Sequence, residues 1–214
     1  MIITIGGIKG GSGKTTISTN LTVIRSSNAK KVLLVDADEQ KSATAWAEQR
    51  EAMKIPSNWT VIQLSGTSVN RQLQKLKDSY DDIIVDVGGR DTTSQRSALS
   101  VTDVFLIPFK PRAYDIWTIS QVSSLILEVS AVNPKLKSIA VLNQTDAIGK
   151  DNDTAEQILK ESNIFETCPF SLGNRKAFAN ASTQGLGVTE LKTQDAKASQ
   201  EIKDLYSYLY VGNI

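Results

Sequence analysis

Largely apolar runs alternate along the chain with longer stretches whose apolar residues recur at helical spacing. The runs cover residues 2–5, 32–35, 60–64, 82–86, 104–108 and 138–143, and a further short run follows at 165–170. Continuous runs of β-branched residues are typical of strands buried on both faces of a parallel sheet. The stretches between them predict helices over 15–27, 42–53, 70–79, 114–132, 151–162, 175–184 and 194–210. This alternation predicts an α/β fold with a doubly wound, mostly parallel sheet flanked by helices.

A glycine-rich stretch lies between the first predicted strand and the first predicted helix. It consists of Lys9, Gly10, Gly11, Ser12, Gly13, Lys14, Thr15 and Thr16. Glycines without a Cβ let successive backbone N–H groups turn toward a phosphate, and the start of a helix attracts the same anion. In such a P-loop, Lys14 would reach the β- and γ-phosphates and the Thr15 hydroxyl would bind Mg²⁺. We therefore expect this stretch to bind ATP with Mg²⁺; the alternative is a glycine-rich turn with solvated lysines.

Acidic residues follow two of the predicted strands, at the sheet edge where α/β proteins carry their sites. Asp86 ends the strand at 82–86 in a Walker B arrangement, and its carboxylate would hold Mg²⁺. Asp36 and Asp38 follow the strand at 32–35. Without the P-loop, these acids could instead cap a turn or lie on the surface. Their assignment to a nucleotide site therefore depends on the P-loop.

Further candidates lie at the same predicted edge. Gly88 and Gly89 follow Asp86, where backbone N–H groups could approach a phosphate and move when it leaves. Asn143 ends another strand, and its amide could contact the edge of adenine; capping of a helix is the alternative. Arg90 could contact phosphate or a partner, but a solvated loop arginine is favoured.

Composition narrows the class of protein. The 214 residues are 40% hydrophobic and 22% charged with a net charge of +1, which is ordinary for a globular chain and gives no overall attraction to nucleic acid. His is absent and Cys168 is the one cysteine, which excludes histidine catalysis and a single-chain cysteine metal cluster. The sequence shows no signal-peptide pattern and no membrane-spanning run. We expect one P-loop ATPase domain over 1–214 and a cytoplasmic location.

Together these motifs resemble the ParA/MinD family of P-loop ATPases. The P-loop departs from the general pattern in the way typical of that family, because Ile8 stands where a glycine is usual and Lys9 precedes the glycines as the signature lysine. Glu39 stands where the family usually has proline. Further segments that resemble family motifs are 35–40, 84–89, 106–111, 175–181 and 184–191. The resemblance is greatest to short ParA proteins without an N-terminal DNA-reading domain, and it implies the P-loop NTPase fold.

The resemblance also implies roles for individual residues. Lys9 would cross the interface of an ATP-dependent homodimer to the nucleotide of the other subunit. Asp38 would position or activate the attacking water, while Asp36 would support Mg²⁺ and the P-loop. Gly88 lies where the family has a loop that senses the γ-phosphate. Lys9, Lys14 and Asp38 are therefore the expected catalytic residues.

The function implied is that of a DNA-segregation ATPase. Its ATP-bound dimer would bind DNA without sequence preference, associate with the nucleoid, and hydrolyse ATP slowly until stimulated by a ParB-like centromere-binding protein. The candidates for DNA contact are Arg175, Lys176, Lys192, Lys197 and Lys203. A solvated helix face is the alternative for them, because residues 170–214 hold five Lys/Arg against four Asp/Glu.

Other functions remain to be weighed. An ATP-switched positioning or scaffold protein for a conjugation, secretion or other subcellular complex is the main alternative. A dethiobiotin-synthetase-like ligase would need further polar pocket residues, which the sequence does not show. A nitrogenase-type iron protein would need more cysteines than Cys168. A MinD-like membrane helix would need basic residues at the C-terminus, and none follows Lys203, so no membrane partner is expected.

Overall fold

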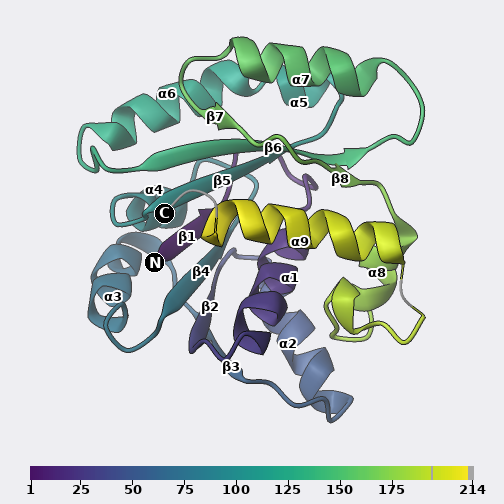
Figure 1. Cartoon of the computed structure of the whole chain (residues 1–214). Helices are drawn as coiled ribbons and strands as arrows, with labels where there is room; N and C mark the ends of the chain where they lie inside the picture. The colour runs from purple at the N-terminus through teal and green to yellow at the C-terminus, as the bar shows by residue number, and fades with distance from the viewer. Residues whose placement is uncertain (194, 212–214) are drawn as a thin grey trace.

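Strands and helices alternate along residues 1–193 and 195–211, which the computed structural model describes (Figure 1). In chain order the elements are β1 (Ile2–Ile5), α1 (Lys14–Ser27), β2 (Val32–Ala37), α2 (Ser42–Ala52), β3 (Trp59–Gln63), the 3₁₀ helix η1 (Gly66–Ser68), α3 (Val69–Leu76), β4 (Asp82–Val87), α4 (Thr93–Leu99), β5 (Val104–Phe109), α5 (Ala113–Ile116), α6 (Ile119–Ser130), β6 (Lys137–Thr145), α7 (Asp151–Glu161), β7 (Glu166–Thr167), β8 (Leu172–Gly173), α8 (Lys176–Ser182), the 3₁₀ helix η2 (Val188–Glu190) and α9 (Ala196–Tyr210). None of the helices in these ranges is long and apolar enough to cross a bilayer.

Strand β1 lies at the centre of a parallel sheet. Within the described residues the sheet has eight strands in the order β3-β2-β4-β1-β5-β6-β7, with β8 also pairing with β6. Each of these pairings is parallel. Helices cover both faces of the sheet (Figure 1). The prediction of an α/β fold with a doubly wound sheet is confirmed.

Neighbouring residues of each central strand belong to different hydrophobic cores. Ile3 and Ile5 face the core formed with α1, α2, α8 and α9. Phe105 and Ile107 face the core formed with α6 and α7, while Leu33 faces the core formed with α3 and α4. Because successive strand residues point to opposite faces, a strand covered on both faces needs apolar residues at every position. This is why the strands appear in the sequence as unbroken apolar runs.

The parallel strands bring their carboxyl ends to one edge of the sheet. Strand β1 leads into the P-loop, β2 and β4 carry Asp36 and Asp86 side by side in register, and β6 carries Asn143. The sequence motifs therefore meet at this edge.

One predicted helix is wrong and two elements are missing from the sequence prediction. The stretch 114–132 forms two helices, α5 and α6, because Thr118 takes the N-cap position of α6 and its carbonyl accepts the Val122 N–H at 2.9 Å. Helix α4 and strand β8 lie where the sequence predicts no element. They have seven and two residues, too few to show a hydrophobic period.

The remaining helices differ from prediction at their ends. Helix α3 begins at Val69 after η1 and ends at Leu76, so it is shorter than the predicted 70–79. Gln194, the predicted start of the last helix, lies outside the described residues, and α9 begins at Ala196.

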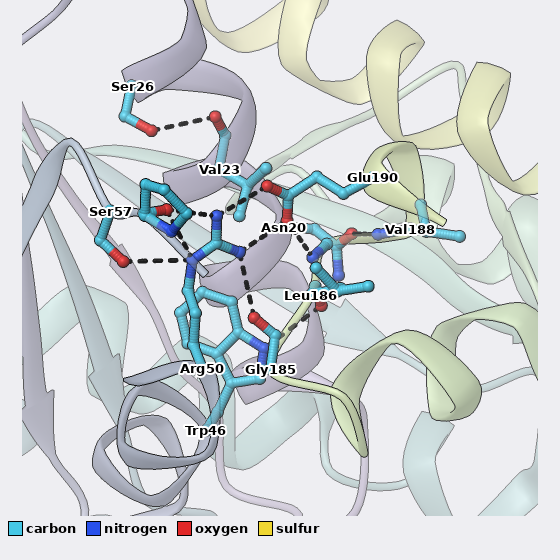
Figure 2. A network of polar contacts seen from close by, with 12 residues as sticks. Asn20, Val23, Ser26, Trp46, Arg50, Ser57, Gly185, Leu186, Val188 and Glu190 are labelled. Carbon is cyan, nitrogen blue, oxygen red and sulfur yellow. Dashed lines mark hydrogen bonds and ion pairs between the residues drawn. The ribbon is translucent and has the colours of Figure 1, made fainter. Parts of the chain in front are cut away.

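A buried arginine joins α2 to the segment that follows α8 (Figure 2). Arg50 is 5% exposed, and its guanidinium donates to both carboxylate oxygens of Glu190 at 2.8 Å. It also donates to the carbonyls of Gly185 at 3.1 Å and Pro56 at 2.8 Å. Gly185 has φ +67°, and a Cβ there would lie 2.4 Å from the backbone nitrogen of Arg50. This close approach of the two backbones therefore requires glycine.

Two further hydrogen bonds hold the same segment. The Trp46 indole donates to the Leu186 carbonyl at 3.2 Å, and the Asn20 side-chain oxygen accepts the Val188 N–H at 2.7 Å (Figure 2). Since Asn20 lies in α1, the helix that begins at the P-loop, the C-terminal part of the chain is tied to both α1 and α2.

Glu190→Ala is expected to lower the free energy of unfolding by about 2–3 kcal/mol, because it leaves the Arg50 charge buried without its carboxylate. The cost falls below that of a fully buried pair because the Glu190 side chain is 27% exposed. The control is Glu156→Ala, which removes an exposed i,i+4 pair with Lys160 and should cost under about 0.5 kcal/mol. Urea denaturation of both variants measures the difference. Equal losses would contradict a stabilising role for the buried pair.

The lone cysteine is inert by position. Cys168 is 4% exposed, and burial raises the pKa of its thiol from 9.0 to about 11. At pH 8 the folded chain therefore carries about 100-fold less reactive thiolate than the unfolded chain. We expect iodoacetamide to alkylate the native protein at least about 100-fold more slowly than the urea-unfolded protein, with the gap closing as the pH rises toward 11. Equal rates at pH 8 would contradict the burial of this thiol.

Candidate functional site

The P-loop between β1 and α1 has the backbone that its glycines allow. Gly11 and Gly13 have φ values of +72° and +88°, in the left-handed region that favours glycine. The Lys14 ammonium donates to the Lys9 carbonyl at 2.9 Å, so the loop curls around its own lysine. Lys14 is 6% exposed, whereas the Lys9 side chain is exposed.

Two amides at the end of β6 hold the P-loop from one side. Asn143 Nδ2 donates to the Ser12 carbonyl at 2.6 Å, and Gln144 Nε2 donates to the Gly11 carbonyl at 3.2 Å. A Cβ on Gly13 would lie 2.1 Å from Asn143 Nδ2, so the contact excludes any side chain there. Asn143 lies within β6, which rules out the helix-capping alternative, and its contact with adenine stays a prediction.

Asp86 is fully buried and bonded to α1. Its carboxylate accepts hydrogen bonds from the Thr15 hydroxyl at 2.7 Å and the Ser18 hydroxyl at 3.0 Å. The pKa of Asp86 is raised to about 7, chiefly by burial and also by the neighbouring Asp36 carboxylate, against the lowering effect of the two hydroxyls and Lys14. An oxygen-only pair of hydroxyl and carboxylate beside a phosphate loop fits Mg²⁺, which prefers hard oxygen ligands. The described residues contain no group of three or more His, Cys, Asp or Glu side chains that could hold a metal ion.

Asp36 and Asp38 lie at the same strand end but have different surroundings. The Asp36 carboxylate is 1% exposed and accepts both the backbone N–H and the hydroxyl of Thr44, at 2.8 and 2.9 Å. It also accepts the Asp38 N–H at 3.2 Å. Asp38 is half-buried, and its carboxylate accepts the Gln40 N–H at 3.1 Å. Asp36 thus fixes the start of α2 and the loop that presents Asp38.

The two glycines after β4 lie against two other parts of the site, the Asp38 carboxylate and the P-loop. A Cβ on Gly88 would lie 3.1 Å from an Asp38 carboxylate oxygen, and one on Gly89 would lie 2.6 Å from the Cα of Gly10. The β4–α4 loop therefore packs directly on the P-loop. Gln95 of α4 adds a second link, because its side-chain oxygen accepts the Gly7 N–H at 3.0 Å.

A cavity of about 680 Å³ opens between these loops. Most predicted site residues line it, namely Gly10, Gly11, Gly13, Lys14, Thr15, Thr16, Asp38 and Gly88, and Arg90 lines it as well. Of the other predicted residues, Ser12, Asp36, Asp86 and Asn143 are buried behind it, and Lys9 is exposed. A second cavity of about 200 Å³ lies where β6 and α8 meet the P-loop, and Asn143 and Phe178 line it. The sequence motifs thus converge on one concave site.

The predicted DNA-contacting residues lie away from this cavity, on α8, α9 and the segment between them. Arg175 at the N-cap of α8 is engaged by Glu201 of α9, at 2.6 Å between Nη2 and Oε1. The candidates with exposed side chains are Lys176, Lys192, Lys197 and Lys203. Their contact with DNA stays a prediction.

Some site residues have no recognisable sequence pattern. Gln95 and Gln144 contact the P-loop from distant parts of the chain, and Thr44 binds Asp36 from α2. Ser18 lies one helical turn after Thr15, and that spacing is the one pattern that could have identified it.

The sequence and the fold were compared with known proteins. Residues 3–193 match the profile of the family described as the CobQ/CobB/MinD/ParA nucleotide binding domain. The chain is 28% identical over 207 residues to maintenance of carboxysome distribution protein A of Halothiobacillus neapolitanus, covering 95% of this chain and 93% of that protein. It is 24% identical over 210 residues to protein ParA of Rhizobium radiobacter, covering 97% and 93%. The fold matches a plasmid partition protein of Borrelia burgdorferi B31 bound to AMPPNP, with a TM-score of 0.77, 20% identity and coverage of 97% and 98%.

Gly89→Ala is expected to destabilise the nucleotide-free protein by about 1–3 kcal/mol, because the new Cβ would overlap the backbone of Gly10. The matched control is Gly10→Ala on the other side of the same contact. A Cβ on Gly10 meets nothing within 4 Å, so this variant should lie within about 0.5 kcal/mol of the parent. Urea denaturation without nucleotide measures both. Equal stability of the two variants would show that the loops do not touch in solution.

Proposed function

Because the chain belongs to the CobQ/CobB/MinD/ParA nucleotide-binding family of ATPases, we propose that it is a ParA-type DNA-segregation ATPase. The observation that carries the proposal is the meeting of the Lys9–Thr16 loop, Asp38 and Gly88 around one cavity, with Asp86 bonded to Thr15 behind it. The AMPPNP bound by the Borrelia relative supports an adenine nucleotide as the ligand.

The arrangement fits hydrolysis of ATP with Mg²⁺. Lys14 would bind the β- and γ-phosphates, and Thr15 and Asp86 would hold Mg²⁺, with Asp36 supporting both. Mg²⁺ supplies neutralisation of phosphate charge when bound. Asp38 lies beside Gly88, where it would position the attacking water. The chain has no histidine to act as general base, so the proposed intrinsic turnover is slow.

Dimerisation would complete the site. Lys9 is exposed at the start of the P-loop and would reach the nucleotide of a second subunit, adding positive charge where the transition state is negative. The dimer would then form with ATP and dissociate after hydrolysis. A ParB-like centromere-binding protein would accelerate that step.

The C-terminal helices offer a basic surface for DNA. The Arg175–Glu201 ion pair removes one charge of each sign, and the exposed lysines Lys176, Lys192, Lys197 and Lys203 remain as candidates for contact with DNA. Two copies of such a surface on a dimer would bind the phosphate backbone without sequence preference and with strong salt dependence.

A positioning protein for a subcellular complex is the second candidate. Its support is the 28% identity over 207 residues to maintenance of carboxysome distribution protein A, a protein named for the distribution of a subcellular body. In that case the ATP-driven switch would be the same, and the cargo would be a protein assembly in place of a DNA partition complex.

Retention on non-specific duplex DNA, measured with ATP, ADP or no nucleotide, separates the partition candidate from the positioning candidate. We expect retention only with ATP and a decline of about 10³-fold or more between 50 and 200 mM salt, because several phosphates are neutralised together. Lys9→Ala should abolish retention by preventing the ATP-bound dimer. Lys135→Ala, which removes an exposed lysine between α6 and β6, is the control and should retain DNA normally.

The outcomes have distinct meanings. ATP-dependent dimerisation without DNA retention would overturn the partition role and leave a positioning protein with another track. Failure of ATP to change the oligomeric state would exclude both candidates.

A further inference from the structure

A lysine to which the sequence analysis assigns no role lies against the P-loop. Lys110 follows β5, and its Nζ lies 3.7 Å from the position that a Cβ on Gly11 would occupy. This is ordinary contact distance, so the ammonium lies beside the backbone of Gly11. Gly11 lines the nucleotide cavity and Lys110 does not, so a positive charge stands next to the loop that would bind phosphate, at the margin of the cavity.

The backbone on both sides of Lys110 is fixed. Phe109 is 2% exposed in the core below it, and Pro111 is buried after it. Arg112 pairs with Asp146 at 2.8 Å, which joins the segment after β5 to the segment after β6. The backbone that carries Lys110 is therefore fixed beside the P-loop, and a ligand would have to order only the side chain.

The charge of Lys110 has no carboxylate to balance it. Among residues 1–113, 116–193 and 195–211, no Asp or Glu oxygen lies within 4.0 Å of its ammonium. The side chain is half-buried, whereas the lysines of α8 and α9 are exposed. A half-buried, unbalanced cation beside a glycine-rich anion site calls for an anionic ligand.

We propose that Lys110 is a further cation of the nucleotide site and binds phosphate oxygens of the nucleotide. The inference rests on the proposed function, since it requires an ATP-binding P-loop. Its chemistry is a charge-assisted hydrogen bond from the ammonium to a phosphate oxygen, in addition to the bonds made by Lys14 and Lys9. The phosphate belongs either to the subunit's own nucleotide or to the nucleotide of a second copy that approaches the same side of the loop.

The test compares Lys110→Gln, Lys110→Arg and Lys135→Gln with the parent protein. Binding of a fluorescent non-hydrolysable ATP analogue to the monomer is measured at low protein concentration, and ATP-driven dimerisation is measured by light scattering. Lys110→Gln should weaken one of the two by roughly 10-fold, as expected for loss of a hydrogen bond to a charged group. Lys110→Arg keeps the charge and should restore most of the loss, whereas Lys135→Gln should match the parent in both measurements.

Each outcome decides the proposal. A loss in monomer binding assigns Lys110 to its own nucleotide, and a loss confined to dimerisation assigns it to the nucleotide of the second copy. Parental behaviour of Lys110→Gln in both measurements would overturn the inference, as would equal losses in the Gln and Arg variants, which would indicate a packing role. If the parent protein itself neither binds the analogue nor dimerises, the proposed function fails instead.

Discussion

The nucleotide site depends on the burial of one carboxylate. Asp86 is fully buried at the end of β4, where a charge is stable only if hydrogen bonds replace the water it has lost. Thr15 and Ser18 supply those bonds, so the first turn of α1 must lie directly over the strand end. Because α1 begins at Gly13, the same bonds fix the P-loop above the sheet. The position of the loop is thus a consequence of satisfying a buried acid.

Around Asp86, the P-loop is held by hydrogen bonds between its backbone and side chains from another strand. The carbonyls of Gly11 and Ser12 are bound by amides of β6, and the β4–α4 loop packs on Gly10. The loop that would surround phosphate is therefore held on more than one side before any ligand arrives. Such pre-organisation reduces the ordering cost of binding a polyphosphate.

The P-loop and the acids of the site were predictable from the sequence because their residues lie close together along the chain. The P-loop and the acids at strand ends are local patterns, so their residues are recognisable before the fold is known. Gln95 and Gln144 carry no such pattern, and the motif-like segment that contains Lys110 does not reveal its contact with Gly11, because each of the three residues meets the P-loop only through the fold of the sheet. The Arg50 network was hidden for the same reason, since its partner Glu190 lies 140 residues away. Short elements such as α4 were missed because seven residues show too little periodicity.

The central place of β1 has a consequence for synthesis of the chain. Ile3 pairs with Ile84 on one side and Val104 on the other, so β1 can be paired on both sides only after β5 has left the ribosome. The P-loop ends at Thr16, but the apolar residues of β1 that precede it remain exposed until β5 has been made. Parallel sheets with such distant pairings fold slowly, and the nascent chain is open to aggregation or chaperone capture in the interval. Nucleotide can stabilise this protein only once β5 has been translated.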